Sequence, residues 1–352
     1  MWKLKLPDTE LKEWYKKKML KGLRDRIMDG RLSLAVCKVL IPIDNAGKED
    51  LSNLEHLLTD EPEALKILND SLMSRIISVS TRRRRPYNDG EFEALLKARA
   101  KQGQKDAVEA ELCDRYAILE KLRQVFDYDN QLGQNKSRAY RLTLEQGHNT
   151  CTYCNRSYVF TVVRDKGKND GDRIARPVLD HWYSKELFPL MSLSLCNLIP
   201  CCSICNSSAK GNAIFRTTTH VHPYIATTPA EPGFKFRYKA QPDGKWAVVI
   251  DPSSDPKENR MVEEFKLEDV YSYHGELEVK DILEWKYQNN DIYLSQVLNG
   301  ILSHYKISRA DVYRMFFGTE LEPVDSLKRP LSKLKRDILK QVGLIDTTGK
   351  WK

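Results

Sequence analysis

The chain has 352 residues, of which 41% are hydrophobic and 30% charged, a composition typical of a globular protein with two or three compact units. No apolar run reaches the roughly 18 to 20 residues that a membrane span requires, and the N-terminal sequence lacks the apolar stretch of a secretory signal, so we expect a cytoplasmic protein with no membrane partner. The net charge of +8 is uneven: lysine and arginine are in excess over residues 1–35, 136–225 and 326–352, which suits either a phosphate-backbone partner or ordinary surface solvation.

Helical periodicity dominates the first segment, residues 1–135. Apolar side chains recur at helical spacing over residues 8–29, where Asp8 is placed to cap the N-terminus. Further helices are predicted at about 50–58, 62–78, 90–101 and 106–126. The stretch TRRRRPYNDG at 81–90 interrupts this pattern with a proline and a turn signal, and its arginines are interpreted as a solvated loop.

The last segment, residues 226–352, is predicted to hold a β-hairpin followed by helices. Apolar and polar residues alternate over 234–250 on both sides of a Pro-Asp-Gly turn, which is typical of an antiparallel hairpin. The helices are predicted at about 278–288, 291–304, 308–317 and 330–342.

The central segment, residues 136–225, contains two Cys-x-x-Cys pairs. The pairs are Cys151 with Cys154 and Cys202 with Cys205. Without an export signal, such pairs favour metal ligation over disulfides, and together they supply the four thiolates of one tetrahedral structural zinc. Cys201 is an alternative to Cys202, although only Cys202 keeps the two-residue gap. Cys37 and Cys113 lie in apolar helical contexts and are predicted to be core residues.

The stretches between and beside these pairs predict an order of strand, loop, strand and helix. RPVLDHW suits a short strand, NLIPC suits a second strand, and CNSSAKGN is placed to begin a helix. The polar RDKGKNDGDR upstream is predicted to be the turn of another hairpin. Zinc binding at the ends of this segment would bring Asp180, His181 and Asn206 together.

These residue types suit hydrolysis of a phosphodiester bond. Asp180 and the amide oxygen of Asn206 are hard oxygen ligands for one divalent cation of the magnesium type. His181 is expected to accept a proton from the attacking water, because its pKa lies near working pH. Asn197 is expected to hold the loop that carries His181 by side-chain hydrogen bonds.

Four further basic side chains belong to the same segment. Lys185 and Lys210 are predicted phosphate contacts. His220 and His222, in THVHPY, are alternatives or supplements to Asn206 as a metal ligand, but a structural or surface role is favoured for both.

In this order, the residues resemble the HNH, or ββα-metal, nuclease family in its zinc-stapled form. That pattern is a thiolate pair, an Asp-His, a central Asn, a second thiolate pair followed by His or Asn, and then a Lys. The matching residues are Cys151, Cys154, Asp180, His181, Asn197, Cys202, Cys205, Asn206 and Lys210. Asn206 departs from the more frequent His. The resemblance covers roughly 136–225 and implies an α+β, predominantly helical protein with a central ββα-metal core and a structural zinc.

The resemblance also implies a metal-dependent endonuclease that uses one Mg²⁺ or Mn²⁺ ion to cut DNA, leaving a 5′-phosphate and a 3′-hydroxyl. The flanking sequences are similar to those of HNH proteins in prokaryotic anti-phage defence, which implies an ATPase as a partner. Because one core makes one cut, a homodimer is a further expectation. Two alternatives stay open: an RNase, for example directed at tRNA, that uses the same site, and an inactive zinc-stapled module for nucleic-acid binding or scaffolding.

Overall fold

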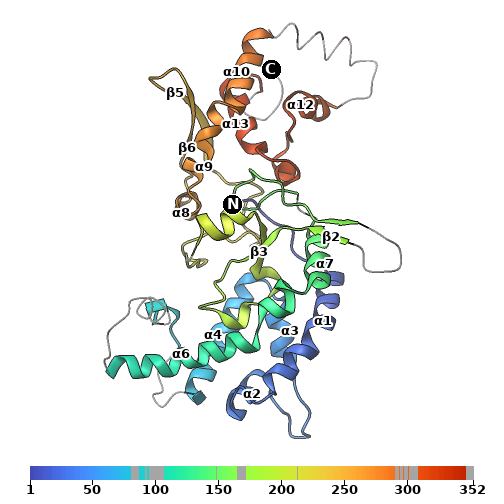
Figure 1. Cartoon of the computed structure of the whole chain (residues 1–352), viewed down its shortest axis with the longest axis vertical. Helices are drawn as coiled ribbons and strands as arrows, with labels where there is room; N and C mark the ends of the chain where they lie inside the picture. Colours follow the sequence, from blue (N-terminus) through green and yellow to red (C-terminus); the bar gives the residue numbers. More distant parts are fainter. Residues whose placement is uncertain are drawn as a thin grey trace. The chain divides into compact units, whose positions relative to one another are not determined.

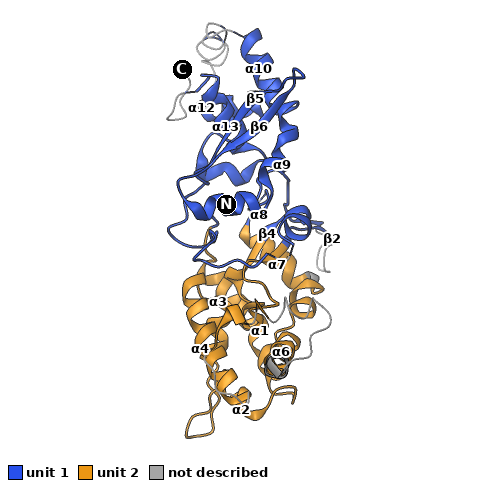
Figure 2. Ribbon diagram, turned by 90° about the vertical axis from the view of Figure 1, so that its left-hand side faces the viewer, with its two compact units in different colours: residues 1–4, 147–178, 200–352 blue, residues 5–146, 179–199 orange. Residues whose placement is uncertain are grey.

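The computed structural model describes residues 1–80, 87–91, 93–94, 107–147, 149–164, 172–211, 213–289, 293, 296, 300 and 308–345. The protein is α+β, with many helices and, over the described residues, three small two-stranded sheets (Figure 1). The chain divides into two compact units (Figure 2). Unit 1 comprises residues 1–4, 147–178 and 200–352, and unit 2 comprises residues 5–146 and 179–199. The division therefore falls within the central cysteine-bearing segment.

Unit 2 contains a group of helices and helical turns. They are α1 (Thr9–Ile27), α2 (Leu34–Leu40), α3 (Ser52–Thr59), α4 (Pro62–Ser80), α6 (Ala107–Val125), η1 (Asp129–Gly133), α7 (Lys136–Gln146), η2 (Pro189–Met191) and η3 (Leu195–Asn197). The helices predicted at 8–29, 50–58, 62–78 and 106–126 are confirmed, whereas α2 and α7 were not predicted. The helix predicted at 90–101 and the arginine-rich loop lie largely outside the described residues.

Helix α1 shows why this sequence forms a helix with one buried face. Asp8 caps it, because its carboxylate accepts a hydrogen bond from the N–H of Leu11 at 2.9 Å. Every fourth residue then turns inward. The buried residues are Leu11, Tyr15, Met19, Leu23 and Ile27. This face contacts α3 and α6, and it joins a core that also includes Cys37, as predicted. The side chain of Cys113 lies outside the described residues.

Unit 1 contains two hairpins and a set of mostly short helices. They are β1 (Val162–Arg164), β2 (Asp172–Ala175), η4 (Ile204–Ala209), β5 (Lys235–Ala240), β6 (Trp246–Asp251), α8 (Pro256–Glu264), α9 (Leu267–Ser272), η5 (Tyr273–Gly275), α10 (Glu278–Gln288), α12 (Arg309–Phe317), η7 (Pro323–Lys328) and α13 (Ser332–Gln341). Both predicted hairpins are confirmed as antiparallel pairs, β1 with β2 and β5 with β6. The turn of the second contains Gly244 at φ +81°, a conformation that favours glycine.

The predicted helices at 278–288, 308–317 and 330–342 are confirmed as α10, α12 and α13, whereas α8 and α9 were not predicted. The helix predicted at 291–304 lies almost wholly outside the described residues. Helix α13 packs on strand β5, and its buried side chains include Leu334, Ile338 and Leu339.

The two strands predicted around the Asp-His pair are also confirmed. Strand β3 (Val178–His181) is hydrogen-bonded to β4 (Leu198–Cys201). The first part of CNSSAKGN, however, lies in a six-residue π-helical turn, η4, which begins at Ile204 and ends at Ala209, instead of beginning an α-helix. The N–H of Lys210 donates to the carbonyl of Cys205, the five-residue spacing of that turn, at 3.1 Å.

Candidate functional site

The four cysteines of the two Cys-x-x-Cys pairs come together in unit 1. The sulfur atoms of Cys151, Cys154, Cys202 and Cys205 all lie within 4.8 Å of one another, and all four side chains are buried. A tetrahedral zinc with bonds of about 2.3 Å requires sulfur atoms roughly 3.8 Å apart, so the four thiols could hold one zinc ion. Cys201 is buried but is not in this group, which decides between it and Cys202.

Backbone N–H groups stabilise negative charge on two of these sulfur atoms. Arg156 N–H donates to Cys154 Sγ and Cys205 N–H donates to Cys202 Sγ, each at 3.4 Å. Burial raises the pKa of Cys151 well above its usual value, whereas hydrogen bonds from neighbouring thiols, chiefly Cys151, lower the pKa of Cys202. A divalent cation would allow all four groups to be thiolates together.

Asn155, which follows the first cysteine pair directly, ties that turn to the C-terminal part of unit 1. It is fully buried and left-handed, at φ +50°. Its side-chain amide donates to Thr150 Oγ1 (2.9 Å), Ser326 O (2.7 Å) and Arg329 O (3.2 Å), and its Oδ1 accepts from Ser332 N–H (3.1 Å). Asn155 was not predicted as a functional residue from the sequence. The available signal was an Asn beside a tight Cys-x-x-Cys turn, because Asn tolerates the left-handed region.

The Asp-His pair ends strand β3 in unit 2. The Asp180 side chain is buried, and His181 is half-buried. His181 Nε2 lies 2.9 Å from the carbonyl oxygen of Ser192, and the Tyr128 ring packs edge-on against the imidazole at 4.4 Å between centroids. A carbonyl oxygen only accepts hydrogen bonds, so Nε2 carries the proton, and in the neutral ring Nδ1 carries the lone pair.

The loop that holds His181 is itself anchored to three parts of unit 2. Ser192 Oγ donates to Phe126 O at the end of α6 (2.6 Å), and Tyr15 of α1 donates its hydroxyl to Leu193 O (2.6 Å). The hydroxyl of Ser194 donates to the carbonyl of Leu57 in α3. The carbonyl that orients the imidazole is therefore fixed by packed helices. Tyr15 lies within the apolar pattern of residues 8–29, and that pattern does not predict this hydrogen bond.

Asn197 closes the same loop from its other side. The residue is fully buried. Its Oδ1 accepts from Tyr183 N–H (2.6 Å), and its Nδ2 donates to Tyr183 O (3.0 Å) and Met191 O (2.9 Å). Its carbonyl oxygen accepts from Trp182 N–H at 3.0 Å. The Asn197 side chain thus bridges both ends of the segment that follows His181.

The other expected site residues have varied surroundings. Asn206 is half-buried on η4 and belongs to unit 1, whereas Asp180 and His181 belong to unit 2. Lys210, also in unit 1, is 5% exposed, and its ammonium lies 4.7 Å from the centroid of the Phe215 ring. Lys185 in unit 2 is more exposed and forms an ion pair with Asp129 at 3.0 Å.

The two histidines downstream of the second cysteine pair are buried. His220 stacks on Phe215 with 4.5 Å between centroids, and burial lowers its pKa to about 4. His222 accepts a hydrogen bond at Nδ1 from Tyr224 N–H (3.2 Å), and burial lowers its pKa well below the usual value. Over the described residues, neither belongs to a group of three or more metal-ligating His, Cys, Asp or Glu side chains. Both fit the structural role that was favoured for them.

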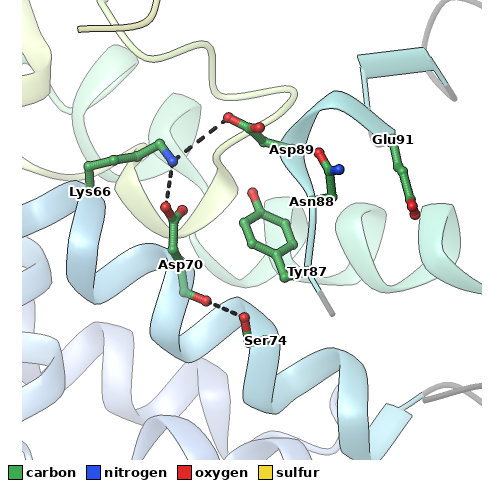
Figure 3. Close-up of a pocket in the computed structure, with 7 residues that line it drawn as sticks. All are labelled: Lys66, Asp70, Ser74, Tyr87, Asn88, Asp89 and Glu91. Atoms are coloured by element: carbon green, nitrogen blue, oxygen red, sulfur yellow. Dashed lines mark hydrogen bonds and ion pairs between the residues drawn. The ribbon is translucent and has the colours of Figure 1, made fainter. Parts of the chain in front are cut away.

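Unit 2 also has a cavity of about 370 Å³ beside α4 (Figure 3). Its lining residues are Lys66, Asp70, Ser74, Tyr87, Asn88, Asp89 and Glu91. The Lys66 ammonium lies 2.6 Å from Asp70 and 3.7 Å from Asp89, so the protein itself supplies a counter-charge to these carboxylates. None of the expected site residues lines this cavity.

Comparison of the chain with protein-family models, with curated proteins and with solved structures gives no match. Among the helices of the described residues, none combines the length and apolar character needed to cross a bilayer.

Proposed function

We propose that the protein is a metal-dependent endonuclease that hydrolyses phosphodiester bonds of DNA. The observation that carries this proposal is the contact between His181 Nε2 and the anchored carbonyl of Ser192. In the neutral imidazole it fixes one tautomer with a basic Nδ1, which is what general-base catalysis requires. The buried Asp180 beside it, and the order of the surrounding residues, support phosphodiester chemistry over other hydrolytic reactions.

In the proposed reaction, His181 accepts a proton from the water that attacks phosphorus. The bond between phosphorus and the 3′-oxygen breaks, which leaves a 5′-phosphate and, after the leaving oxygen takes up a proton, a 3′-hydroxyl. Asn197 and Ser192 keep the imidazole and its loop in place. Asp180 would supply a carboxylate oxygen of the kind that Mg²⁺ or Mn²⁺ prefers, and the Asn206 ligand stays a prediction from the sequence. Such an ion would polarise the phosphate and stabilise the charge on the leaving oxygen.

The cysteine cluster has a separate role in this proposal. We assign it one structural zinc, because four protein thiolates would fill all positions of a tetrahedral ion and leave none for substrate. The biological setting that we propose is prokaryotic anti-phage defence in the cytoplasm, with an ATPase partner or a second copy of the chain. This setting is supported by the likeness of the flanking sequences alone.

The test is cleavage of supercoiled plasmid by the purified protein with Mg²⁺ or Mn²⁺. We expect His181→Ala to cut at least about 100-fold more slowly, because general bases typically contribute a factor of that order or more. His56→Ala is the matched control, since His56 is an exposed histidine of α3 in the same unit, paired with Asp60. It should cut like the unsubstituted protein.

Equal cleavage by the His181→Ala variant and the unsubstituted protein would remove His181 from the mechanism. Cleavage of RNA but not of DNA, with the same dependence on His181, would support the RNase alternative. Binding of nucleic acid without cleavage of either polymer would support the inactive binding module.

A further inference from the structure

The basic residues near the two ends of the chain differ in how their charges are neutralised. In the C-terminal part of unit 1, basic side chains are paired with carboxylates of the same unit. The pairs are Lys328 with Asp325, Arg329 with Glu320, Lys333 with Asp337, Lys335 with Glu278 and Arg336 with Glu231. Carboxylates of unit 1 therefore neutralise much of the positive charge of this segment.

Helix α1 in unit 2 is different. Lys17, Lys18 and Lys21 are exposed, and within the described part of the chain none of them forms an ion pair. Neighbours three and four positions apart share a helix face, so each of the three lysines leaves α1 on the side of Trp14, away from the buried residues of the helix. Lys16, by contrast, is paired with Glu13 at 2.6 Å.

Helix α7 extends this surface. The guanidinium of Arg141 lies 4.6 Å from the centroid of the Trp14 ring, and its side chain is 46% exposed. Among the described residues its ion-pair partner is Glu145, at 3.8 Å, a distance and exposure at which an ion pair contributes little. We call Trp14, Lys17, Lys18, Lys21 and Arg141 the basic stripe.

We propose that the basic stripe binds the phosphate backbone of duplex DNA. The choice of polymer rests on the proposed endonuclease function. The physical reason is that three unneutralised ammonium groups within about two helical turns form a local excess of charge, which attracts a polyanion and releases its condensed counterions. The guanidinium of Arg141 has N–H donors for a phosphate in addition to its position over the Trp14 ring. No base edge is read, so binding should be independent of sequence and sensitive to salt.

The test measures binding of a fluorescently labelled duplex to the full chain by anisotropy, without added Mg²⁺ so that the DNA stays intact. The variant replaces all three lysines by alanine, as Lys17→Ala, Lys18→Ala and Lys21→Ala together. We expect roughly 10- to 100-fold weaker binding near 0.1 M salt. The dependence of log K on log salt should lose about 2 to 3 from its slope, because each phosphate contact contributes about 0.9.

The matched control removes the same charge elsewhere in unit 2, as Lys38→Ala, Lys48→Ala and Lys121→Ala together. These lysines are also exposed, but they lie on separate elements. This variant should keep its affinity within about twofold, and the arginine triple Lys17→Arg, Lys18→Arg, Lys21→Arg should bind like the unsubstituted protein.

Equal weakening by both alanine triples would show that net charge matters and that the stripe does not, and this result would overturn the proposal. So would unchanged binding by the stripe variant, whether or not the protein cleaves DNA. The endonuclease proposal fails separately, through the His181→Ala comparison. Loss of binding in the stripe variant, together with unchanged cleavage by His181→Ala, would therefore retain the stripe and reject the catalytic assignment.

Discussion

Tyr15 illustrates how single residues far apart in sequence position the candidate base. Its hydroxyl donates to Leu193 O, 178 residues further along the chain, and Leu193 adjoins the carbonyl that orients His181. Tyr15 is fully buried, and burial raises the pKa of its hydroxyl well above the usual value. The hydroxyl is therefore protonated and a donor at neutral pH. Tyr15 is a positioning residue in the proposed mechanism.

We predict that Tyr15→Phe lowers kcat for DNA cleavage about tenfold with little change in KM, because the loop behind His181 loses one anchor. The free energy of unfolding should fall by about 1 to 2 kcal/mol, since Leu193 O is left without its donor. The kinetic constants and a urea titration measure these effects.

The control for this prediction is Tyr271→Phe in unit 1. Tyr271 is equally buried and donates its hydroxyl to the carbonyl of Cys154. The Tyr271→Phe variant should lose a similar free energy of unfolding, but its kcat should be unchanged. If both variants lower kcat to the same extent, the loss reflects general destabilisation and the positioning role of Tyr15 is wrong.

At this scale the sequence identified residues whose chemistry is set by their own side chains. The two Cys-x-x-Cys pairs predicted a metal site, and the structure places their sulfur atoms together. The sequence did not identify Ser192, whose contribution is a backbone carbonyl, or Asn155, whose partners lie up to 177 residues away. Such contacts depend on the tertiary fold, and no local pattern encodes them.

The Asn155 hydrogen bonds link two elements, the first Cys-x-x-Cys turn and helix α13. We predict that Asn155→Gly lowers the free energy of unfolding of unit 1 by about 2 to 4 kcal/mol. Glycine accepts the left-handed backbone, so the loss measures the hydrogen bonds and not strain. Denaturant unfolding followed by hydrogen exchange in each unit provides the measurement.

Asn206→Gly is the matched control, because Asn206 follows the second cysteine pair as Asn155 follows the first. It lies on η4 and is only half-buried, so its loss should cost about 1 kcal/mol or less. Similar costs for the two variants would contradict the special role that we assign to Asn155.

The longest helices were predictable, whereas the two shortest of the described α-helices were not. Helices α1, α4 and α6 each have 19 residues, so their apolar spacing repeats often enough to be recognised. Helix α2 has seven residues and α9 has six, less than two full turns each. The helix predicted to begin in CNSSAKGN was wrong for another reason. The sulfur atoms of Cys202 and Cys205 lie in one cluster, and we infer that this requirement overrides the local helix preference at η4.

At the scale of the whole molecule, the cysteine cluster belongs to one unit only. We predict that zinc analysis finds about one tightly bound ion per chain, and that its removal by a chelator, or Cys151→Ser, unfolds unit 1 first. Unit 2 has its own buried core and should keep its protection in hydrogen exchange. Amide exchange resolved by peptide provides the measurement.

Loss of protection in both units at the same rate would contradict this prediction, and so would a chain that contains no zinc. Cys37→Ser is a suitable control, because Cys37 is a buried cysteine of unit 2 outside the cluster. Its substitution should leave the zinc content unchanged.

The α+β class and the mainly helical character were predictable from the patterns, but the composition of the two units was not. Residues 1–4 belong to unit 1, because Trp2 N–H donates to Thr152 O and Leu4 N–H donates to Pro223 O. Residues 179–199 belong to unit 2, since Ser192 and Ser194 bond to its helices. These assignments follow from hydrogen bonds between distant residues, which no change in composition along the chain marks.

Because residues 1–4 belong to unit 1 and residues 179–199 belong to unit 2, neither half of the chain contains a complete unit when the protein is cut between residues 146 and 147. A fragment that ends at residue 146 keeps α1, α3 and α6 but loses the loop that these helices hold, and with it the carboxylate and imidazole of β3. A fragment that begins at residue 147 keeps that loop but exposes the serines that fasten it. Neither unit is encoded by one uninterrupted stretch. Loss of activity in a truncated protein would therefore reflect misfolding, whereas point substitutions test the role of single side chains.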